Sequence, residues 1–212
     1  MTLLSRCDSI VSMTDGTAAV RNDDTRRALL AAAHDLLAGE GPGGLTVRRI
    51  AAAAGVSTMN VYSRFGGKDG VLDELFIDGF RRLTARMEAS PSSDDAMADL
   101  RQCGACYRRF ALDNPTYYSL MFDRVVPDFE PSDAAVATAL ASLGELAARV
   151  QRAMDAGRLR PGDAFSVAAA LWACEHGLVS LELRMADERG QAFDWDAIAP
   201  LAVNAMLDGL AT

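Results

Sequence analysis

Six polar side chains gather in the short stretch "GVSTMNVYSRFGGKDGVLDELF", residues 55–76, and they are Ser57, Thr58, Asn60, Tyr62, Ser63 and Arg64. Their hydroxyl, amide and guanidinium groups donate and accept hydrogen bonds and can bind phosphate. The stretch contains no nucleophile with an adjacent base, which covalent catalysis would need. It therefore predicts a binding surface and not a catalytic site.

The helical repeat divides these residues into two faces. At about 100° per residue, Val61 and Phe65 share one face, and Met59, Asn60 and Ser63 lie on the opposite one. A helix presented this way fits the major groove of DNA, where an asparagine can bond N6 and N7 of adenine and an apolar side chain can touch thymine methyl groups. We therefore expect the second face to read bases.

Other residues of this region suit the phosphate backbone of DNA. Thr46 and Ser57 are predicted at helix N-termini, where free N–H groups favour anions, and Tyr62, Arg64 and Lys68 can reach the backbone on either side. The full set of candidate DNA contacts is Thr46, Arg48, Ser57, Thr58, Met59, Asn60, Tyr62, Ser63, Arg64 and Lys68. The alternative is an ordinary capped helical hairpin with a polar exterior.

The charge of the chain is unevenly distributed. The net charge is −8, yet residues 21–68 hold seven basic and four acidic side chains, whereas residues 69–212 hold 13 basic and 23 acidic ones. A local basic face on an acidic body can bind phosphates while the body repels off-register contacts. The first third of the chain is therefore the candidate contact surface for double-stranded DNA.

Nearly every segment has apolar residues three and four apart, which predicts an all-α protein of about nine helices. Two short helices, 46–53 and 57–65, are joined through Gly55 and follow a first helix over 25–39, so they form a helix-turn-helix. A linking helix over 68–89 leads to a C-terminal helical bundle, with further helices over 95–112, after 114–115, and over 132–156, 162–187 and 194–210. We divide the chain into a disordered tail (1–20), a helix-turn-helix domain (21–67) and a C-terminal domain (68–212).

The chain has no apolar run that we read as a membrane span, so we expect a cytoplasmic protein. Met13 is an alternative start of the protein.

The four cysteines lack the spacing of a disulfide framework, in agreement with a reducing compartment; they are Cys7, Cys103, Cys106 and Cys174. Cys103 and Cys106 form a CxxC inside a helical pattern. They are two ordinary helix cysteines, a redox switch or part of a metal site, and the first interpretation is favoured because only two histidines are present.

The stretch "TVRRIAAAAGVSTMNVYSRFGGKDGVLDELF", preceded by "TRRALLAAAHDLLAGEG", resembles the N-terminal DNA-binding region of TetR-family transcriptional regulators. The resemblance covers residues 25–75 and is carried by Thr46, Ile50, Ala51, Ala54, Gly55, Val56, Ser57, Tyr62, Phe65, Lys68 and Leu72. Arg64 stands where the family often has a histidine, and Met59 stands where a small residue is usual. The stretches "NPTYYSLMF" (114–122) and "LWACEHGLVSLEL" (171–183) resemble the C-terminal domain subgroup with a Trp-x-x-x-His-Gly signature.

The resemblance implies a homodimer paired through the last two helices, with an effector cavity in each C-terminal domain. It also implies a repressor. Effector binding would move the linking helix and separate the two helix-turn-helix domains of the dimer from a palindromic operator. For the dimer contact we select Leu178, Leu181, Met185, Val203, Met206 and Leu210. Packing within one chain is the alternative role for these residues.

Trp172 and His176 are four residues apart and share a helical face, with Glu175 adjacent. Such a pair is more often a satisfied part of the core than a ligand contact. As candidate ligand-binding residues we select Phe110, Tyr117, Tyr118, Met121, Phe122, Trp172, Glu175 and His176. An aromatic and methionine-rich wall favours a small apolar or aromatic effector, although these residues could equally be plain core.

Two other classes of function compete with DNA binding. A helical enzyme would need an activated nucleophile, a metal cluster or a phosphate loop, and the sequence shows none; Glu175 and His176 are neighbours that point about 100° apart. We therefore expect no catalytic residue, cofactor or metal. A helical module that binds only another protein is the second alternative.

Overall fold

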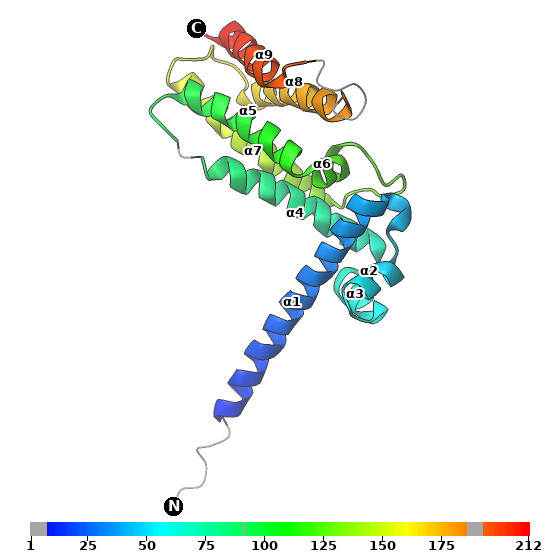
Figure 1. The fold of residues 1–212 in the computed structure, drawn as a ribbon. Helices are drawn as coiled ribbons and strands as arrows, with labels where there is room; N and C mark the ends of the chain where they lie inside the picture. The colour runs from blue at the N-terminus through cyan, green and yellow to red at the C-terminus, as the bar shows by residue number, and fades with distance from the viewer. Residues whose placement is uncertain (1–7, 91, 186–192) are drawn as a thin grey trace, which may run out of the picture. The chain divides into compact units, whose positions relative to one another are not determined.

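The computed structural model describes residues 8–90, 92–185 and 193–212. Over these ranges the chain forms nine α-helices and one short 3-10 helix without any strand, which confirms the all-α prediction (Figure 1). The elements are α1 (Asp8–Glu40), η1 (Pro42–Gly44), α2 (Val47–Ala53), α3 (Thr58–Phe65), α4 (Lys68–Glu88), α5 (Ala96–Asp113), α6 (Pro115–Phe122), α7 (Asp133–Asp155), α8 (Ala164–Met185) and α9 (Trp195–Leu210).

The chain forms two compact units, and the boundary between them falls inside α4. The first unit comprises residues 1–75 and 125–129, and the second comprises residues 76–124 and 130–212. The sequence predicts the boundary at Lys68, where α4 begins. The helix therefore starts in the first unit and continues into the second.

The first unit is held together by an apolar core between α1, α2, α3 and the start of α4. Leu29, Ala33, Ile50, Val61 and Leu72 are fully buried there. Helices α2 and α3 pack against each other and against α1 (Figure 1). This packing supplies the rigid support that a short helix such as α3 lacks on its own.

Local capping explains where α2 and α3 begin and end. Thr46 caps α2 by accepting a hydrogen bond from the backbone N–H of Arg49 at 3.3 Å, and Gly55 has the left-handed φ of 68° that the turn requires. Both predictions are confirmed. Ser57 occupies the N-cap position of α3, but its side chain makes no capping bond, which corrects the capping role expected from the sequence. Its hydroxyl oxygen instead accepts from the side-chain amide of Asn60.

Helix α1 begins at Asp8, much earlier than the predicted start near Thr25. The sequence "NDD" at residues 22–24 had suggested a cap, but Asp24 pairs with Arg27 one turn further along the same helix. The predicted disordered tail thus overlaps α1 from residue 8 onward, and residues 1–7 lie outside the described residues.

The second unit is a bundle built around α5, α7 and α8, which pack against one another (Figure 1). Helix α9 packs on α5 and α8, and α6 packs on α5. Asp95, Ser132 and Asp194 cap α5, α7 and α9 with their side chains. The predicted bounds of these helices therefore hold to within one or two residues.

Helix α8 is long and apolar enough to cross a membrane by length and composition alone, which corrects our reading that no such run exists. It is the one helix of this kind among the described residues, and a core helix passes the same test. In this fold α8 packs against α5, α7 and α9, and Glu175 and His176 lie in its middle. The apolar character of α8 is thus weak evidence for a membrane.

Candidate functional site

The outer face of α3 presents its largest side chains to solvent. Met59 is 70% exposed and Tyr62 is 54% exposed, while Val61 on the inner face is fully buried. Ser57, Thr58 and Ser63 are exposed as well. Large exposed apolar groups beside hydroxyls are typical of a contact surface.

Hydrogen bonds between side chains fix Asn60 at the centre of this face. Arg64 Nη1 donates to Asn60 Oδ1 at 2.7 Å, and Asn60 Nδ2 donates to Ser57 Oγ at 3.1 Å. Each amide atom keeps one further site, because Oδ1 has a second lone pair and Nδ2 a second hydrogen. The amide plane is therefore oriented by its neighbours and can still bond both N6 and N7 of an adenine.

Some arginine and lysine side chains of the first unit are held in ion pairs, and others are available to bind a phosphate. Arg49 forms a two-point ion pair with Glu40, whose pKa is held below its ordinary value mainly by this hydrogen bonding. By contrast, Arg48 and Lys68 form no side-chain hydrogen bond or ion pair within the described part of the chain. The adjacent Arg48 and Arg49, which look alike in the sequence, thus differ in the structure. Arg49 is held in an ion pair and Arg48 is not.

Arg26 ties α3 to the helices on either side of it. Its guanidinium lies 4.8 Å from the centroid of the Phe65 ring and forms an ion pair with Glu74 of α4. Because α1, α3 and α4 all contribute, contacts of this side chain add to those of the core in positioning α3.

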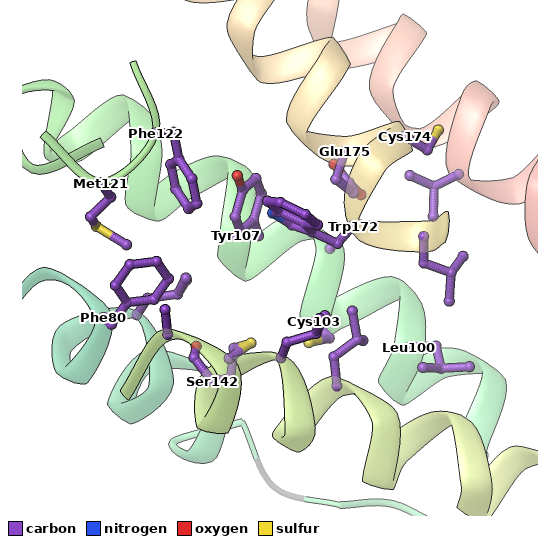
Figure 2. Close-up of a pocket in the computed structure, with 18 of the residues that line it drawn as sticks. Phe80, Leu100, Cys103, Tyr107, Met121, Phe122, Ser142, Trp172, Cys174 and Glu175 are labelled. Atoms are coloured by element: carbon purple, nitrogen blue, oxygen red, sulfur yellow. The ribbon is translucent and has the colours of Figure 1, made fainter. Parts of the chain in front are cut away.

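The second unit contains a cavity of about 280 Å³, lined by side chains from α4 to α9. Its wall is almost entirely apolar, with aromatic rings from α4, α5, α6 and α8. Figure 2 shows Phe80, Tyr107, Phe122 and Trp172 around this space. A pocket of this kind suits an apolar or aromatic small molecule.

Half of the residues that the sequence suggested for ligand binding line this cavity. Met121, Phe122, Trp172 and Glu175 do so, and Phe110, Tyr117, Tyr118 and His176 do not. These last four side chains make contacts outside the cavity. Phe110 is buried in the core, and the Tyr117 hydroxyl donates to Asp78 Oδ2 at 2.6 Å.

His176 is a satisfied core histidine. Its Nδ1 lies 3.1 Å from the Tyr107 hydroxyl and 2.9 Å from the Tyr118 hydroxyl. Burial lowers the pKa of His176, so the neutral ring is favoured. Trp172 and His176, four residues apart on α8, therefore differ in their surroundings. Trp172 lines the cavity, and His176 packs behind the cavity wall.

Several cavity-lining residues were not predicted from the sequence. They are Phe76, Phe80, Leu83 and Met87 of α4, Leu100, Cys103, Gly104 and Tyr107 of α5, Ala139, Leu140, Ser142, Leu143 and Leu146 of α7, Leu171 and Cys174 of α8, and Val203, Met206 and Leu207 of α9. The apolar repeat marks them as inward-facing, but it does not distinguish a packed core from a cavity. Gly104, a glycine in the middle of a helix, is a signal that could have drawn attention to this part of α5.

The CxxC cysteines lie on α5 as free thiols. Burial raises the pKa of Cys103 to about 11, so this thiol stays protonated near neutral pH and is a weak nucleophile. Among the described residues no three His, Cys, Asp or Glu side chains are grouped to hold a metal ion. These observations favour ordinary helix cysteines.

The predicted dimer residues separate into two groups. Val203, Met206 and Leu210 of α9 are partly buried and pack against the core of their own chain, and their part in a dimer contact stays a prediction. On α8, Leu181 is 52% exposed, and Leu178 and Met185 are half-buried. On α9 the large apolar side chain of Leu201 is 69% exposed, and the sequence analysis did not select it.

Two family models match this chain. Residues 29–75 match bacterial regulatory proteins of the tetR family, and residues 100–206 match the tetracyclin repressor-like C-terminal domain. The chain belongs to the TetR family. It is therefore a DNA-binding transcriptional regulator, of a family whose members are typically ligand-responsive dimers and generally not enzymes.

Solved structures share the TetR fold along most of the chain. A protein of unknown function from Rhodococcus sp. RHA1 aligns over 89% of this chain and 96% of its own, with 29% identity and a TM-score of 0.77. The TetR-family regulator PfmR from Thermus thermophilus aligns over 85% of this chain and 97% of its own (20% identity, TM-score 0.65). The fatty acid degradation regulator FadR from Bacillus halodurans aligns over 86% and 94% (16% identity, TM-score 0.68). A comparison with curated proteins gave no match.

Proposed function

We propose that this TetR-family protein is a repressor that leaves a palindromic operator when a small apolar or aromatic effector enters the cavity of its second unit. The observation that carries this proposal is the course of α4. The helix begins at Lys68 in the first unit, and further along it Phe76, Phe80, Leu83 and Met87 line the cavity. A ligand that displaces these side chains therefore acts on the helix that leads into the DNA-binding unit.

In this proposal the face of α3 divides its work between bases and phosphates. Met59, Asn60 and Ser63 read base edges, with the oriented amide of Asn60 at the centre. The phosphate contacts come from the hydroxyls and cations at the rim of this face, which are Thr46, Arg48, Ser57, Thr58, Tyr62, Arg64 and Lys68. Assignment to the Trp-x-x-x-His-Gly subgroup is part of the same proposal.

We further propose that α8 and α9 form the dimer contact, through Leu181 and Leu201. Both are exposed apolar side chains on the last two helices, and a two-fold contact buries the same patch on each subunit. Small exposed residues on the same helices, such as Ala173 and Ala205, would allow close approach. Two-fold symmetry then requires two operator half-sites.

The energetic requirement for release is modest. To lower operator affinity about 100-fold, the effector must bind the non-binding conformation better by about 2.7 kcal/mol. A ligand with equal affinity for both conformations would leave the operator occupied.

Gel retardation of the DNA upstream of the protein's own gene tests this function. We expect a retarded complex at low salt that weakens steeply as salt rises, because bound cations release counterions from DNA. If the wild-type protein fails to retard this DNA at low salt, the repressor function is wrong, and a module that binds only protein becomes the better interpretation.

Replacing Asn60 by alanine should lower sequence preference and preserve nonspecific binding. The variant loses the only side-chain amide on the α3 face, which we expect to cost about 1 to 3 kcal/mol at one base pair. Competition between operator and random DNA measures the preference. Gln151→Ala, which removes an exposed amide from α7, is the matched control and should change nothing. If the sequence preference is unchanged in Asn60→Ala, then Asn60 is not one of the residues that read bases.

Replacing Arg64 by alanine should reduce the salt dependence of DNA binding by about one unit of slope in log affinity against log salt. Because Arg64 also holds Asn60 Oδ1, we expect part of the sequence preference to be lost as well. Lys68→Ala is the matched control, since Lys68 lacks such a bond, and it should reduce the slope and leave the preference intact. Equal effects of the two variants on preference would contradict the orienting role of Arg64.

A further inference from the structure

Glu175 is a carboxylate without a partner in an apolar cavity. The residue is 8% exposed and lines the cavity, its Oε2 atom is buried, and no hydrogen bond or ion pair reaches it from the described residues. Buried polar atoms are nearly always hydrogen-bonded, and an orphaned one is costly. Such an atom marks the place of a donor that arrives with a ligand.

The space for this carboxyl group depends on a glycine in α5, and a glycine lowers the stability of a helix. A Cβ atom on Gly104 of α5 would lie 2.2 Å from Glu175 Oε1 and 3.1 Å from its Cδ, so any larger residue there would push the carboxyl group out of its present position. A glycine within a helix costs about 1 kcal/mol relative to alanine. The chain therefore gives up helix stability at the point where the carboxyl group lies.

The cavity wall offers this group no cation. The lining residues include no Lys, Arg or His. The neighbouring Arg108 is already bonded to Glu182 at 2.7 Å and to Asp196 at 2.8 Å, and Arg149 donates to the carbonyl of Met87 at 2.8 Å. An anionic ligand would meet Glu175 without any compensating positive charge.

The aromatic side chains of the wall suit a cation. Tyr107 and Trp172 line the cavity together with Glu175 (Figure 2). Phe76, Phe80 and Phe122 complete the aromatic set. The faces of such rings attract ammonium groups, and more strongly where water is excluded. Carboxylate and rings together form a binding site for an amine on an apolar body.

We propose that the effector is a hydrophobic amine whose protonated nitrogen donates a hydrogen bond to Glu175 and whose apolar body fills the aromatic cavity. This inference rests on the proposed function, because it names the chemical class of the ligand that the cavity takes. It also makes Glu175 the residue that selects an amine over a hydrocarbon or an acid of the same shape.

The ionisation of Glu175 supplies a second signature. Burial raises the pKa of Glu175 to about 7, and Arg108 opposes this shift only in part. Burial raises the pKa of Cys103 and Tyr107 of α5 and of Cys174, which moves their ionisation further above this range, and it lowers the pKa of His176, which favours the neutral ring. The hydrogen bond to Glu182 raises the pKa of Arg108, which therefore stays charged. Affinity for an amine should therefore rise about tenfold from pH 6 to pH 8, as the carboxylate forms.

Isothermal titration of the full-length protein with four probes of similar shape tests the proposal. The probes are 4-phenylbutylamine, 4-phenylbutan-1-ol, pentylbenzene and 4-phenylbutanoic acid, each small enough for a cavity of about 280 Å³. We expect the amine to bind at least about tenfold more tightly than pentylbenzene at pH 8, because a buried hydrogen bond to a charged group is strong. The acid should bind most weakly.

Two variants make the test specific. Glu175→Gln should lose the preference for the amine and its pH dependence, while pentylbenzene binds as before. Glu145→Gln changes an exposed carboxylate of α7 that does not line the cavity, and it should behave as the wild type. Equal affinity for the amine and pentylbenzene, absence of amine binding, tighter binding of the acid, or an unaffected Glu175→Gln variant would each overturn the proposal.

Operator release separates this inference from the proposed function. If the amine binds in a Glu175-dependent way and operator DNA stays bound, the ligand class stands and the repressor mechanism fails. If operator DNA is released by pentylbenzene and the acid as readily as by the amine, the mechanism stands and the selective role of Glu175 is overturned.

Discussion

Replacing Asp99 by alanine is expected to lower the free energy of unfolding of the second unit by about 3 kcal/mol. Asp99 is a buried carboxylate that accepts from the backbone N–H of Ser93 at 2.9 Å and from the Ser93 hydroxyl at 2.8 Å, and it pairs with Arg152 of α7. Arg152 in turn donates to the Ser93 carbonyl at 3.1 Å. The network joins the segment before α5 to α5 and α7.

The size of this effect follows from what the substitution leaves behind. Loss of one partner of a buried ion pair typically costs about 3 to 5 kcal/mol, because the remaining charge is desolvated and unpaired. The Arg152 side chain is partly exposed and can be hydrated, which places the expected cost at the lower end. Urea denaturation followed by the circular dichroism of the helices measures it.

Asp95→Ala is the matched control on the same helix. Asp95 is an exposed N-cap that accepts from the backbone N–H groups of Met97 and Ala98, and such a cap contributes about 1 kcal/mol. If Asp99→Ala costs no more than Asp95→Ala, then Asp99 acts as an ordinary surface carboxylate and the network carries no special weight.

Replacing Gly70 by alanine is expected to destabilise the first unit by about 3 kcal/mol, at the upper end of what overpacking costs. An added Cβ would lie 1.7 Å from the carbonyl oxygen of Phe65 and 2.8 Å from its carbon. Backbone atoms cannot move aside as a flexible side chain does, so α3 and α4 must separate. DNA affinity should fall together with stability, since Phe65 is the last residue of α3, the helix proposed to contact DNA.

Hydrogen exchange measures this effect within the first unit. We expect exchange of the Ile50 amide, which bonds the Thr46 carbonyl at 2.9 Å, to accelerate about a hundredfold in Gly70→Ala. Gly39→Ala is the control, because a Cβ there meets nothing within 4 Å and adds helix propensity. Similar exchange in the two variants would show that α3 and α4 tolerate the extra atom.

The sequence predicted those features whose causes lie within a few neighbouring residues. Thr46 and Gly55 delimit α2 and its turn through bonds and dihedral angles that involve only the adjacent chain, and they were found where expected. The exposed face of α3 followed from the helical repeat in the same way. The start of α1 was wrong because Asp24 has two local options, a cap or a pairing with Arg27, and the helix adopts the second.

The tertiary structure decided which inward-facing residues surround a cavity and which fill the core. Trp172 and His176 share one helical face, yet the first lines the cavity and the second bonds two tyrosines. Val203 and Met206 have the repeat expected of a dimer contact, and within their own chain they pack against the core and line the cavity.

The sequence by itself therefore determined an all-helical TetR-type protein with an exposed face on α3, because caps, turns and amphipathic repeats are local properties of the chain. Only the tertiary structure placed Glu175 against Gly104, 71 positions apart, in a cavity without a cation. The physical reason is that periodicity reports whether a side chain turns inward, whereas its partner is set by the packing of distant helices. The chemistry of the proposed ligand site follows from that packing.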